Sequence, residues 1–436
     1  MNWLDLCSNF VSQALKTKQI GTPVAVRVVA HLVADHGLIE RLTVPWIEEV
    51  SKWLNSHADQ VTAMGSVEMG QISTLTLFPG GQSALVAVGS CGIGRPLLEV
   101  IVWGNRGILS WEPEGVSDIG DSTNEQELSE EATRLLHLLR RSLQGEEEAS
   151  SLGIKTTLTK SRNPKARKPP YGVLLVAGDY THQPDYAESL ASDKRCHLVG
   201  LADEANVTDR RRQLNEQLAR RLGIPYFTDL SRAIRREDVQ IVSVCAEPIR
   251  RGRIIAQAAE AGKQLYLDKP LAATLQDAQA IITAVNTAGV VNHMWSLVRS
   301  NVVQRTSKAM HTEDFGELTA IHSDLCFAKG YTGTASLGQR RQEIPLPTRY
   351  EMPDSKREMS NVGVYLLVAL LWLTGKNVRR VRATTGNYFF QEHQHNDMED
   401  FGQMLLELDG GLIATISAGR TGWKSYPAGG PVSYTH

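Results

Sequence analysis

Short apolar runs alternate with helix-like segments between residues 172 and 267, and this alternation constrains the fold more than any other feature of the chain. Apolar runs bounded by turn residues are typical of strands buried on both faces of a parallel sheet. Parallel strands need crossover connections, which the helix-like segments supply. We therefore expect an α/β domain with a right-handed, doubly wound parallel sheet and a ligand at the carboxyl ends of its strands. The expected strands are 172–177, 197–202, 224–226, 239–244 and 264–267, and the expected helices are 184–192, 207–222, 230–236 and 252–261.

An internal repeat relates the two ends of the chain. The tetrapeptide SNFV at 8–11 recurs as SNVV at 300–303, and each copy continues into a helix-like stretch, a glycine (Gly21, Gly316) and a strand. Because the matches keep their order over about a hundred residues, we interpret them as a duplication rather than as chance similarity of short segments. The further matching segments are 46–54 with 365–373, 61–66 with 381–386, and 75–90 with 405–419.

The composition excludes several classes of protein. Lys and Arg number 46 against 48 Asp and Glu, so the net charge is −2 and we expect neither nucleic acid nor an acidic membrane as a partner. The longest apolar stretch, 362–373, is shorter than the ~20 residues of a membrane-spanning helix, and no signal peptide is visible. The five cysteines are scattered without a CxxC pair, which predicts no disulfide framework, no zinc site and a cytoplasmic location.

The turn after the first parallel strand retains one glycine of the dinucleotide pattern G-x-G-x-x-G, whose glycines let the backbone approach a pyrophosphate. It reads AGDYTHQP over 177–184, with Gly178 retained and Asp179 adding a negative charge. Gly178 with Thr181 and His182 could form an alternative phosphate-binding turn, and His182 could equally face substrate.

An acidic pair follows the second strand. Asp203, with Glu204 beside it, lies where a carboxylate can accept a hydrogen bond from the adenosine ribose, which slightly favours NAD. The arginines at 210–212 could instead serve the 2′-phosphate of NADP, although such a run is more commonly a solvated helix face.

The segment AGKQLYLDKPLAAT, 261–274, carries the strongest local motif. A helix ends, an apolar strand follows, and Asp268, Lys269 and Pro270 come at its carboxyl end. A lysine there can donate to a sugar hydroxyl or work as an acid or base, or it can simply pair with Asp268.

With this motif, residues 171–436 resemble the Gfo/Idh/MocA (glucose–fructose oxidoreductase / inositol dehydrogenase) family, whose signature AGKHVxxEKPxAxT has Asp268 here in place of Glu. The resemblance implies a Rossmann domain followed by an α+β domain with an open, mainly antiparallel sheet. It also implies oxidation or reduction of a sugar, cyclitol or related polyol with NAD or NADP. Lys269 matches the family's catalytic lysine.

Further family motifs are altered in this sequence. The motif D-x-G-x-H or D-x-G-x-Y reads NVGVY, so Tyr365 matches the proton-transferring residue and Asn361 can bind substrate without taking a proton. A spacing of four places both on one helical face. His293 faces the site by the same resemblance. The motif T-P-x-x-x-H reads AEPIRR over 246–251, and its expected cofactor contacts are Ala246, Glu247, Pro248 and Arg251. Asp268, Lys269 and Pro270 of the segment 261–274 are further expected cofactor contacts.

The repeat and the resemblance together predict the domain organisation. We expect an α+β domain at 1–144 that resembles the family's C-terminal domain, a linker at 145–170, a Rossmann domain at 171–292 and an α+β domain at 293–436. The N-terminal copy has neither motif, so we assign it no chemistry. Family members commonly dimerise through these sheets, so we expect either a homo-oligomer or an internal pseudo-dimer in which the two sheets pack face to face.

The leading prediction is an NAD(P)-dependent oxidoreductase that transfers a hydride to or from a sugar-like substrate. The alternative is a catalytically impaired family member that serves as a nucleotide- or sugar-binding protein or a scaffold, and NAD-dependent glycoside or dehydration chemistry is a third possibility. We expect no metal. The histidines His311, His393 and His395 are predicted to lie on the surface, and the acids Asp397, Glu399 and Asp400 in a solvated turn.

Overall fold

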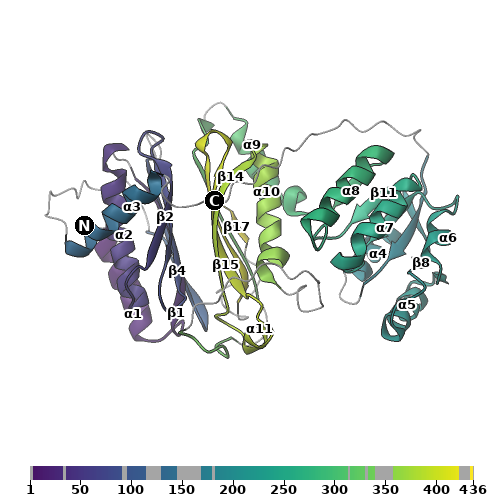
Figure 1. Cartoon of the computed structure of the whole chain (residues 1–436), viewed down its shortest axis with the longest axis horizontal. Coiled ribbons are helices and arrows are strands. Elements are labelled where there is room, and N and C mark those ends of the chain that lie inside the picture. The colour runs from purple at the N-terminus through teal and green to yellow at the C-terminus, as the bar shows by residue number, and fades with distance from the viewer. Residues whose placement is uncertain are drawn as a thin grey trace. The chain divides into compact units, whose positions relative to one another are not determined.

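A computed structural model of the chain divides into two compact units (Figure 1). The first, here the mixed-sheet unit, joins the described residues up to 144 with those from 297 onward, and the second, the parallel-sheet unit, holds the described residues 168–296. Each unit is described by itself. The structure describes residues 3–32, 36–90, 96–113, 129–144, 168–178, 182–312, 315–328, 332–338, 357–421 and 433–435. The predicted linker lies largely outside them.

The parallel-sheet unit confirms the predicted doubly wound sheet. Its strand order is β12-β11-β10-β7-β8-β9, and its strand pairs are parallel. The strands are β7 (Tyr171–Val176), β8 (Cys196–Ala202), β9 (Tyr226–Phe227), β10 (Ile241–Val244), β11 (Gln264–Leu267) and β12 (Asn292–Met294). The helices are α4 (Gln183–Ser192), α5 (Asp209–Leu222), α6 (Leu230–Ile234), α7 (Pro248–Glu260) and α8 (Leu275–Ala288).

Local sequence sets the limits of these helices. The side chains of Thr208 and Thr274 accept hydrogen bonds from the first turns of α5 and α8, and left-handed glycines end both helices. Helix α7 begins at Pro248, four residues before the predicted start, because a proline at the first helical position has a fitting φ and no amide to satisfy. The earlier start brings Arg250 and Arg251 into its first turn.

The mixed-sheet unit contains two sheets. The N-terminal sheet has the order β2-β3-β4-β1-β5-β6 and the C-terminal sheet the order β14-β15-β16-β13-β17. The first comprises β1 (Pro23–Leu32), β2 (Gln60–Ser66), β3 (Gln71–Leu77), β4 (Ser83–Ser90), β5 (Leu97–Gly104) and β6 (Gly107–Trp111). The second comprises β13 (Ala320–Ala328), β14 (Val378–Gly386), β15 (Phe401–Leu408), β16 (Ile413–Thr421) and β17 (Ser433–Thr435).

The two sheets have the same topology and the same register. In each, the first strand pairs in parallel with the fourth and antiparallel with the fifth. Gly21 and Gly316 precede the first strands with φ of +76° and +75°, a conformation that glycine adopts without strain. Corresponding end pairs of the second and third strands are Gln60↔Leu77 and Ser66↔Gln71 in the N-terminal sheet, and Arg380↔Glu407 and Gly386↔Phe401 in the C-terminal sheet.

The two sheets pack face to face, with helices on their outer sides (Figure 1). Helices α1 (Trp3–Lys16), α2 (Ile39–Leu54) and α3 (Glu130–Leu143) accompany the N-terminal sheet, and α9 (Asn301–Met310) and α10 (Val364–Thr374) the C-terminal one. The rings of Trp103 and Phe401 meet between the sheets at 5.1 Å. The buried Arg27 bridges Glu99 on its own sheet and Asp324 on the other, the latter at 3.0 Å. The inner faces therefore form one shared core.

Candidate functional site

Lys269 lies at the carboxyl end of β11, in a loop that is held by side chains. Lys269 is buried, and its backbone amide donates to the carboxylate of Asp268 at 2.9 Å. The phenol of Tyr186, on α4, donates to the same carboxylate at 2.9 Å. Both the burial and the charge of Asp268 raise the pKa of Tyr186, so this phenol stays protonated and keeps donating. The lysine is thereby held at the strand edge where ligands of such sheets bind.

Arg251 fastens this loop from α7. Its buried guanidinium donates to the carbonyl oxygens of Ala246 at 2.7 Å, Asp268 at 2.8 Å, and Pro270. A guanidinium has five donors in a fixed fork and no acceptor, so several carbonyls can satisfy it together. These contacts use its donors on the backbone around Lys269. The expected contact of Arg251 with a cofactor stays a prediction.

His182 stands beside the same carboxylate, just before α4. Its Nδ1 lies 3.2 Å from both oxygens of Asp268, and about half of its side chain is exposed. Burial alone would raise the pKa of Asp268, but the hydrogen bond from His182, the charge of Arg251 and the hydrogen bond from Tyr186 lower it below its ordinary value. Asp268 therefore stays ionised, and its carboxylate can accept a hydrogen bond from Nδ1 of His182.

His293 follows next along this edge. It is exposed, and its ring lies 5.7 Å from that of Tyr266, which meets Tyr186 edge-on at 5.3 Å. The rings of His293 on β12, Tyr266 on β11 and Tyr186 on α4 therefore form a row of neighbouring rings.

Asp203 directly follows β8 and is completely buried. Arg250 of α7 donates to it at 2.8 Å, to Glu204 at 2.9 Å and to Glu247 at 2.7 Å. Burial opposes the charge of Arg250, but the hydrogen bond to Asp203 and the charge of Glu247 raise its pKa. Sequence analysis did not single out Arg250. The only signal for it was a run of arginines after Glu247.

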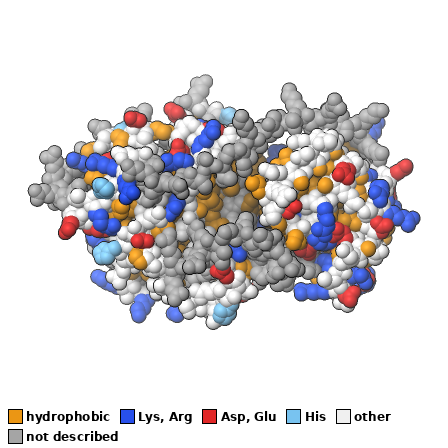
Figure 2. Space-filling model, viewed as in Figure 1, with side chains coloured by type: hydrophobic (Ala, Val, Ile, Leu, Met, Phe, Trp, Pro, Cys, Tyr) orange, Lys and Arg blue, Asp and Glu red, His pale blue; other side chains and the backbone are white. Residues whose placement is uncertain are grey.

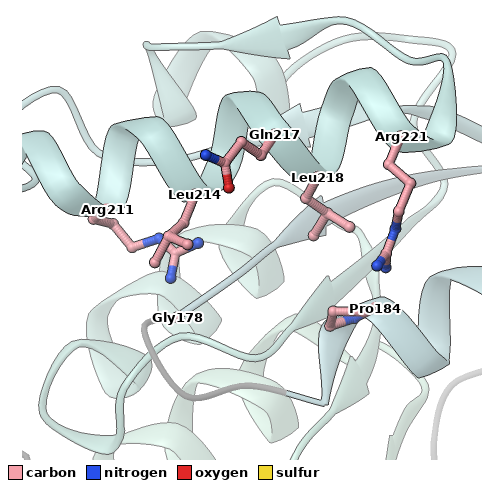
Figure 3. A pocket seen from close by; sticks show the side chains of 7 residues that line it. All are labelled: Gly178, Pro184, Arg211, Leu214, Gln217, Leu218 and Arg221. Atoms are coloured by element: carbon pink, nitrogen blue, oxygen red, sulfur yellow. The ribbon is translucent and has the colours of Figure 1, made fainter.

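A cavity of about 400 Å³ adjoins Gly178, lined by Pro184 and by residues of α5 (Figure 3). Arg211 and Arg221 border it. Arg211 is buried and hydrogen-bonds to Asn215 at 2.8 Å, so the interpretation of this arginine as part of a solvated face is wrong. The predicted cofactor contacts Asp179 and Thr181 lie outside the described residues.

Asn361 and Tyr365 belong to the mixed-sheet unit. Asn361 lies in a π-helical turn, Met359–Gly363, that leads into α10, and such turns are frequent at functional sites. Its amide donates to the buried Glu358 at 3.3 Å. Tyr365 is buried on α10, with its ring edge-on to that of Phe327 at 6.3 Å. Lys269 belongs to the other unit.

Two predictions about the second half of the chain are wrong. His393 is fully buried, with Nε2 3.5 Å from Glu358, and is not a surface histidine. Glu399 and Asp400 are also buried. Asp400 accepts backbone hydrogen bonds from three consecutive residues, 388–390, so it organises a loop rather than lying in a solvated turn. His311, His395 and Asp397 are exposed.

Other features of the described residues limit what the site can be. Among them, no group of three or more His, Cys, Asp and Glu side chains is arranged to hold a metal ion. None of their helices combines the length and the apolar character needed to cross a bilayer. On the visible face, basic and acidic side chains are interspersed (Figure 2).

Several known structures are similar to this chain at low sequence identity. An NAD-binding protein from Listeria innocua is 18% identical with a TM-score of 0.46, over 61% of this chain and 71% of that one. The apo scyllo-inositol dehydrogenase from Lactobacillus casei is 15% identical with a TM-score of 0.47, over 59% and 70%. A probable dehydrogenase from Thermotoga maritima is 17% identical with a TM-score of 0.47, over 60% and 74%. No curated protein matches the chain significantly in sequence.

Two family matches cover more than half of the chain. Residues 175–295 match the oxidoreductase family with an NAD-binding Rossmann fold, and residues 303–434 match the Gfo/Idh/MocA C-terminal domain. These features define an NAD-binding Rossmann protein with a second, mixed-sheet domain. The chain belongs to the Gfo/Idh/MocA family of oxidoreductases.

Proposed function

We propose that the chain is an NAD(P)-dependent oxidoreductase that transfers a hydride between the cofactor and a carbinol carbon of a sugar, cyclitol or related polyol. The observation that carries the proposal is the buried Lys269 at the carboxyl end of β11, in a loop anchored by Arg251 and Tyr186. A polar network that fixes one lysine at the ligand-binding edge of the sheet suits the orientation of a hydroxyl group.

The residues present fit a dinucleotide. Gly178 follows β7 at a point where a Cβ atom would lie 2.7 Å from the carbonyl oxygen of Cys245, so the close approach needs glycine. Asp203 directly follows β8, where a ribose would be held. When bound, the nicotinamide accepts or donates the hydride.

The chain's own residues orient the substrate and move the proton. Lys269 orients and polarises the reacting hydroxyl, Tyr365 transfers its proton, and Asn361 holds a neighbouring hydroxyl. His182, backed by the ionised Asp268, is a second group able to exchange that proton. His293, exposed nearby, is a further hydrogen-bonding group for a polyol.

The test is a fluorescence titration with NADH and NADPH. Three results together support the proposal. The wild type binds a nucleotide, Asp203→Ala loses this binding, and Lys269→Ala keeps the binding but no longer turns over a panel of polyols. Lys263→Ala is the matched control, because Lys263 precedes the same strand at its opposite end and donates to the carbonyls of Arg236 and Val239 at 2.8 Å. Absence of binding at millimolar nucleotide contradicts the proposal and favours a binding or scaffold role.

We also propose that the N-terminal sheet is a catalytically silent internal copy that serves as the partner of the C-terminal sheet. The shared strand order, the shared register and the matching glycines Gly21 and Gly316 support a duplication. In the aligned helices Trp46 stands at the place of Tyr365 and Leu42 at that of Asn361, so the copy lacks both polar groups. Light scattering should give a monomer of 48.0 kDa, whereas a stable dimer at micromolar concentration contradicts this role.

A further inference from the structure

The carboxylate expected to hold the cofactor's ribose is completely buried and accepts three hydrogen bonds. Oδ1 of Asp203 accepts from Nη1 of Arg250 at 2.8 Å and from the amide of Glu204 at 2.9 Å. Its Oδ2 accepts from Nδ2 of Asn215 at 2.8 Å, and Arg211 lies 3.9 Å away. Because Asp203 is completely buried, a donor on a bound molecule can reach this carboxylate only when a neighbouring group moves away.

Arg250 is the donor that can leave most readily. The amide of Glu204 is fixed by the backbone, and Asn215 is buried on α5 between Asp203 and Arg211. Arg250 reaches Asp203 with the end of a long side chain, while its Nε donates to Glu247 at 2.7 Å within the same helical turn. The bond to Glu247 can keep the guanidinium charge paired after Nη1 has left Asp203.

We propose that Arg250 competes with the adenosine ribose of the cofactor for Asp203 and so sets the affinity for NADH. The inference rests on the proposed function. In the free protein Arg250 compensates the buried charge of Asp203, and in the complex the ribose hydroxyls replace it as donors. Arg250 is thus a positioning residue that determines cofactor affinity.

The test compares NADH binding by the wild type, Arg250→Leu and the control Arg253→Leu. Arg253 lies one turn further along α7 and pairs with Glu204 at 2.6 Å, so the control removes an arginine–carboxylate pair but leaves Asp203 untouched. Because a charge-assisted hydrogen bond no longer has to be broken, Arg250→Leu should bind NADH about 10- to 100-fold more tightly, and Arg253→Leu should not.

Protein stability provides the second readout. Without nucleotide, Arg250→Leu should melt at a lower temperature because a buried carboxylate loses its partner, and NADH should raise its melting temperature more than that of the wild type. Arg250→Gln, which keeps a donor but removes the charge, serves if the leucine variant does not fold. It should bind NADH with intermediate affinity.

Each outcome decides the inference. Unchanged NADH affinity in Arg250→Leu overturns it while the proposed function stands. Weaker binding of NADH or NADPH shows that Arg250 contacts the cofactor, which also overturns it. Binding by Arg250→Leu where the wild type binds nothing supports it strongly. If neither variant of Arg250 nor the wild type binds NADH, the inference fails together with the proposed function.

Discussion

The cluster that joins the two sheets offers a direct test of how the mixed-sheet unit is held together. The side chains of Arg27, Glu99 and Asp324 are almost completely removed from solvent, with relative exposures of 1%, 3% and 0%. Arg27→Met keeps most of the side-chain length but leaves two carboxylates buried without their cation. Removing one partner of a buried ion pair costs ~3–5 kcal/mol, so the free energy of unfolding should fall by about that amount.

Urea unfolding followed by tryptophan fluorescence measures this loss, because the tryptophans of the described residues other than Trp295 belong to the mixed-sheet unit. Arg140→Met is the control, since Arg140 forms an exposed pair with Glu40 at 2.8 Å, and such pairs contribute little. Adding Glu99→Gln and Asp324→Asn to Arg27→Met should recover part of the loss. A fall of less than about 1 kcal/mol in Arg27→Met would refute the reasoning that an uncompensated charge is left between the sheets.

Three further predictions concern single residues. Burial raises the pKa of Asp400 to about 6, above its ordinary value. The stabilisation by its protonated carboxyl group is therefore complete below pH ~4, and the free energy of unfolding falls by about 3 kcal/mol as pH rises through 6. Urea unfolding of Asp400→Asn at several pH values should lack this dependence. Gly316→Ala should destabilise the protein by about 1 kcal/mol because its φ is positive. Gly21→Ala should destabilise it by more, because a Cβ at residue 21 would lie 2.3 Å from the side-chain oxygen of Asn105, whereas a Cβ at residue 316 would have no atom within 4 Å. Thermal melts compare the two variants. Arg251→Lys cannot bond the same set of carbonyls, so it should lower the turnover that depends on Lys269 far more than it lowers NADH affinity.

Much of the fold could be predicted because its determinants are local. Continuous apolar runs indicated the parallel strands, and ordered matches such as 61–66 with 381–386 indicated that two sheets share one topology. In the structure both segments form the second strand of their sheet and pair with the third strand. The first four strands of each sheet are arranged in the same order. The duplication itself stays a prediction.

The errors lie where distant residues decide burial. His393, Glu399 and Asp400 stand in a polar stretch without periodicity, and hydrophilic sequence there suggested a solvated turn. Asp400 is buried because backbone amides of 388–390 converge on it, and a sequence does not reveal such convergence. Arg250 was missed for the same reason, since its partner Asp203 is distant in sequence. The two meet only because the first turn of α7 comes close to the residue that follows β8.

Arg251, a residue of an altered motif, donates hydrogen bonds to the loop that carries Lys269. These contacts bear on the question of whether the altered motif means lost activity. Arg251 stands near the place of a histidine in the family pattern, and it binds the backbone on both sides of Lys269. If Arg251 served only to fill the core, any buried acceptors could satisfy its donors. Its donors instead converge on the loop that carries Lys269. The buried Tyr186 and the half-exposed His182 converge on the adjacent carboxylate. A scaffold protein needs no such concentration of polar groups on the loop that carries one lysine, because each buried polar group is costly unless it is satisfied. The contacts of Arg251 therefore support the proposal that this loop still serves to position Lys269.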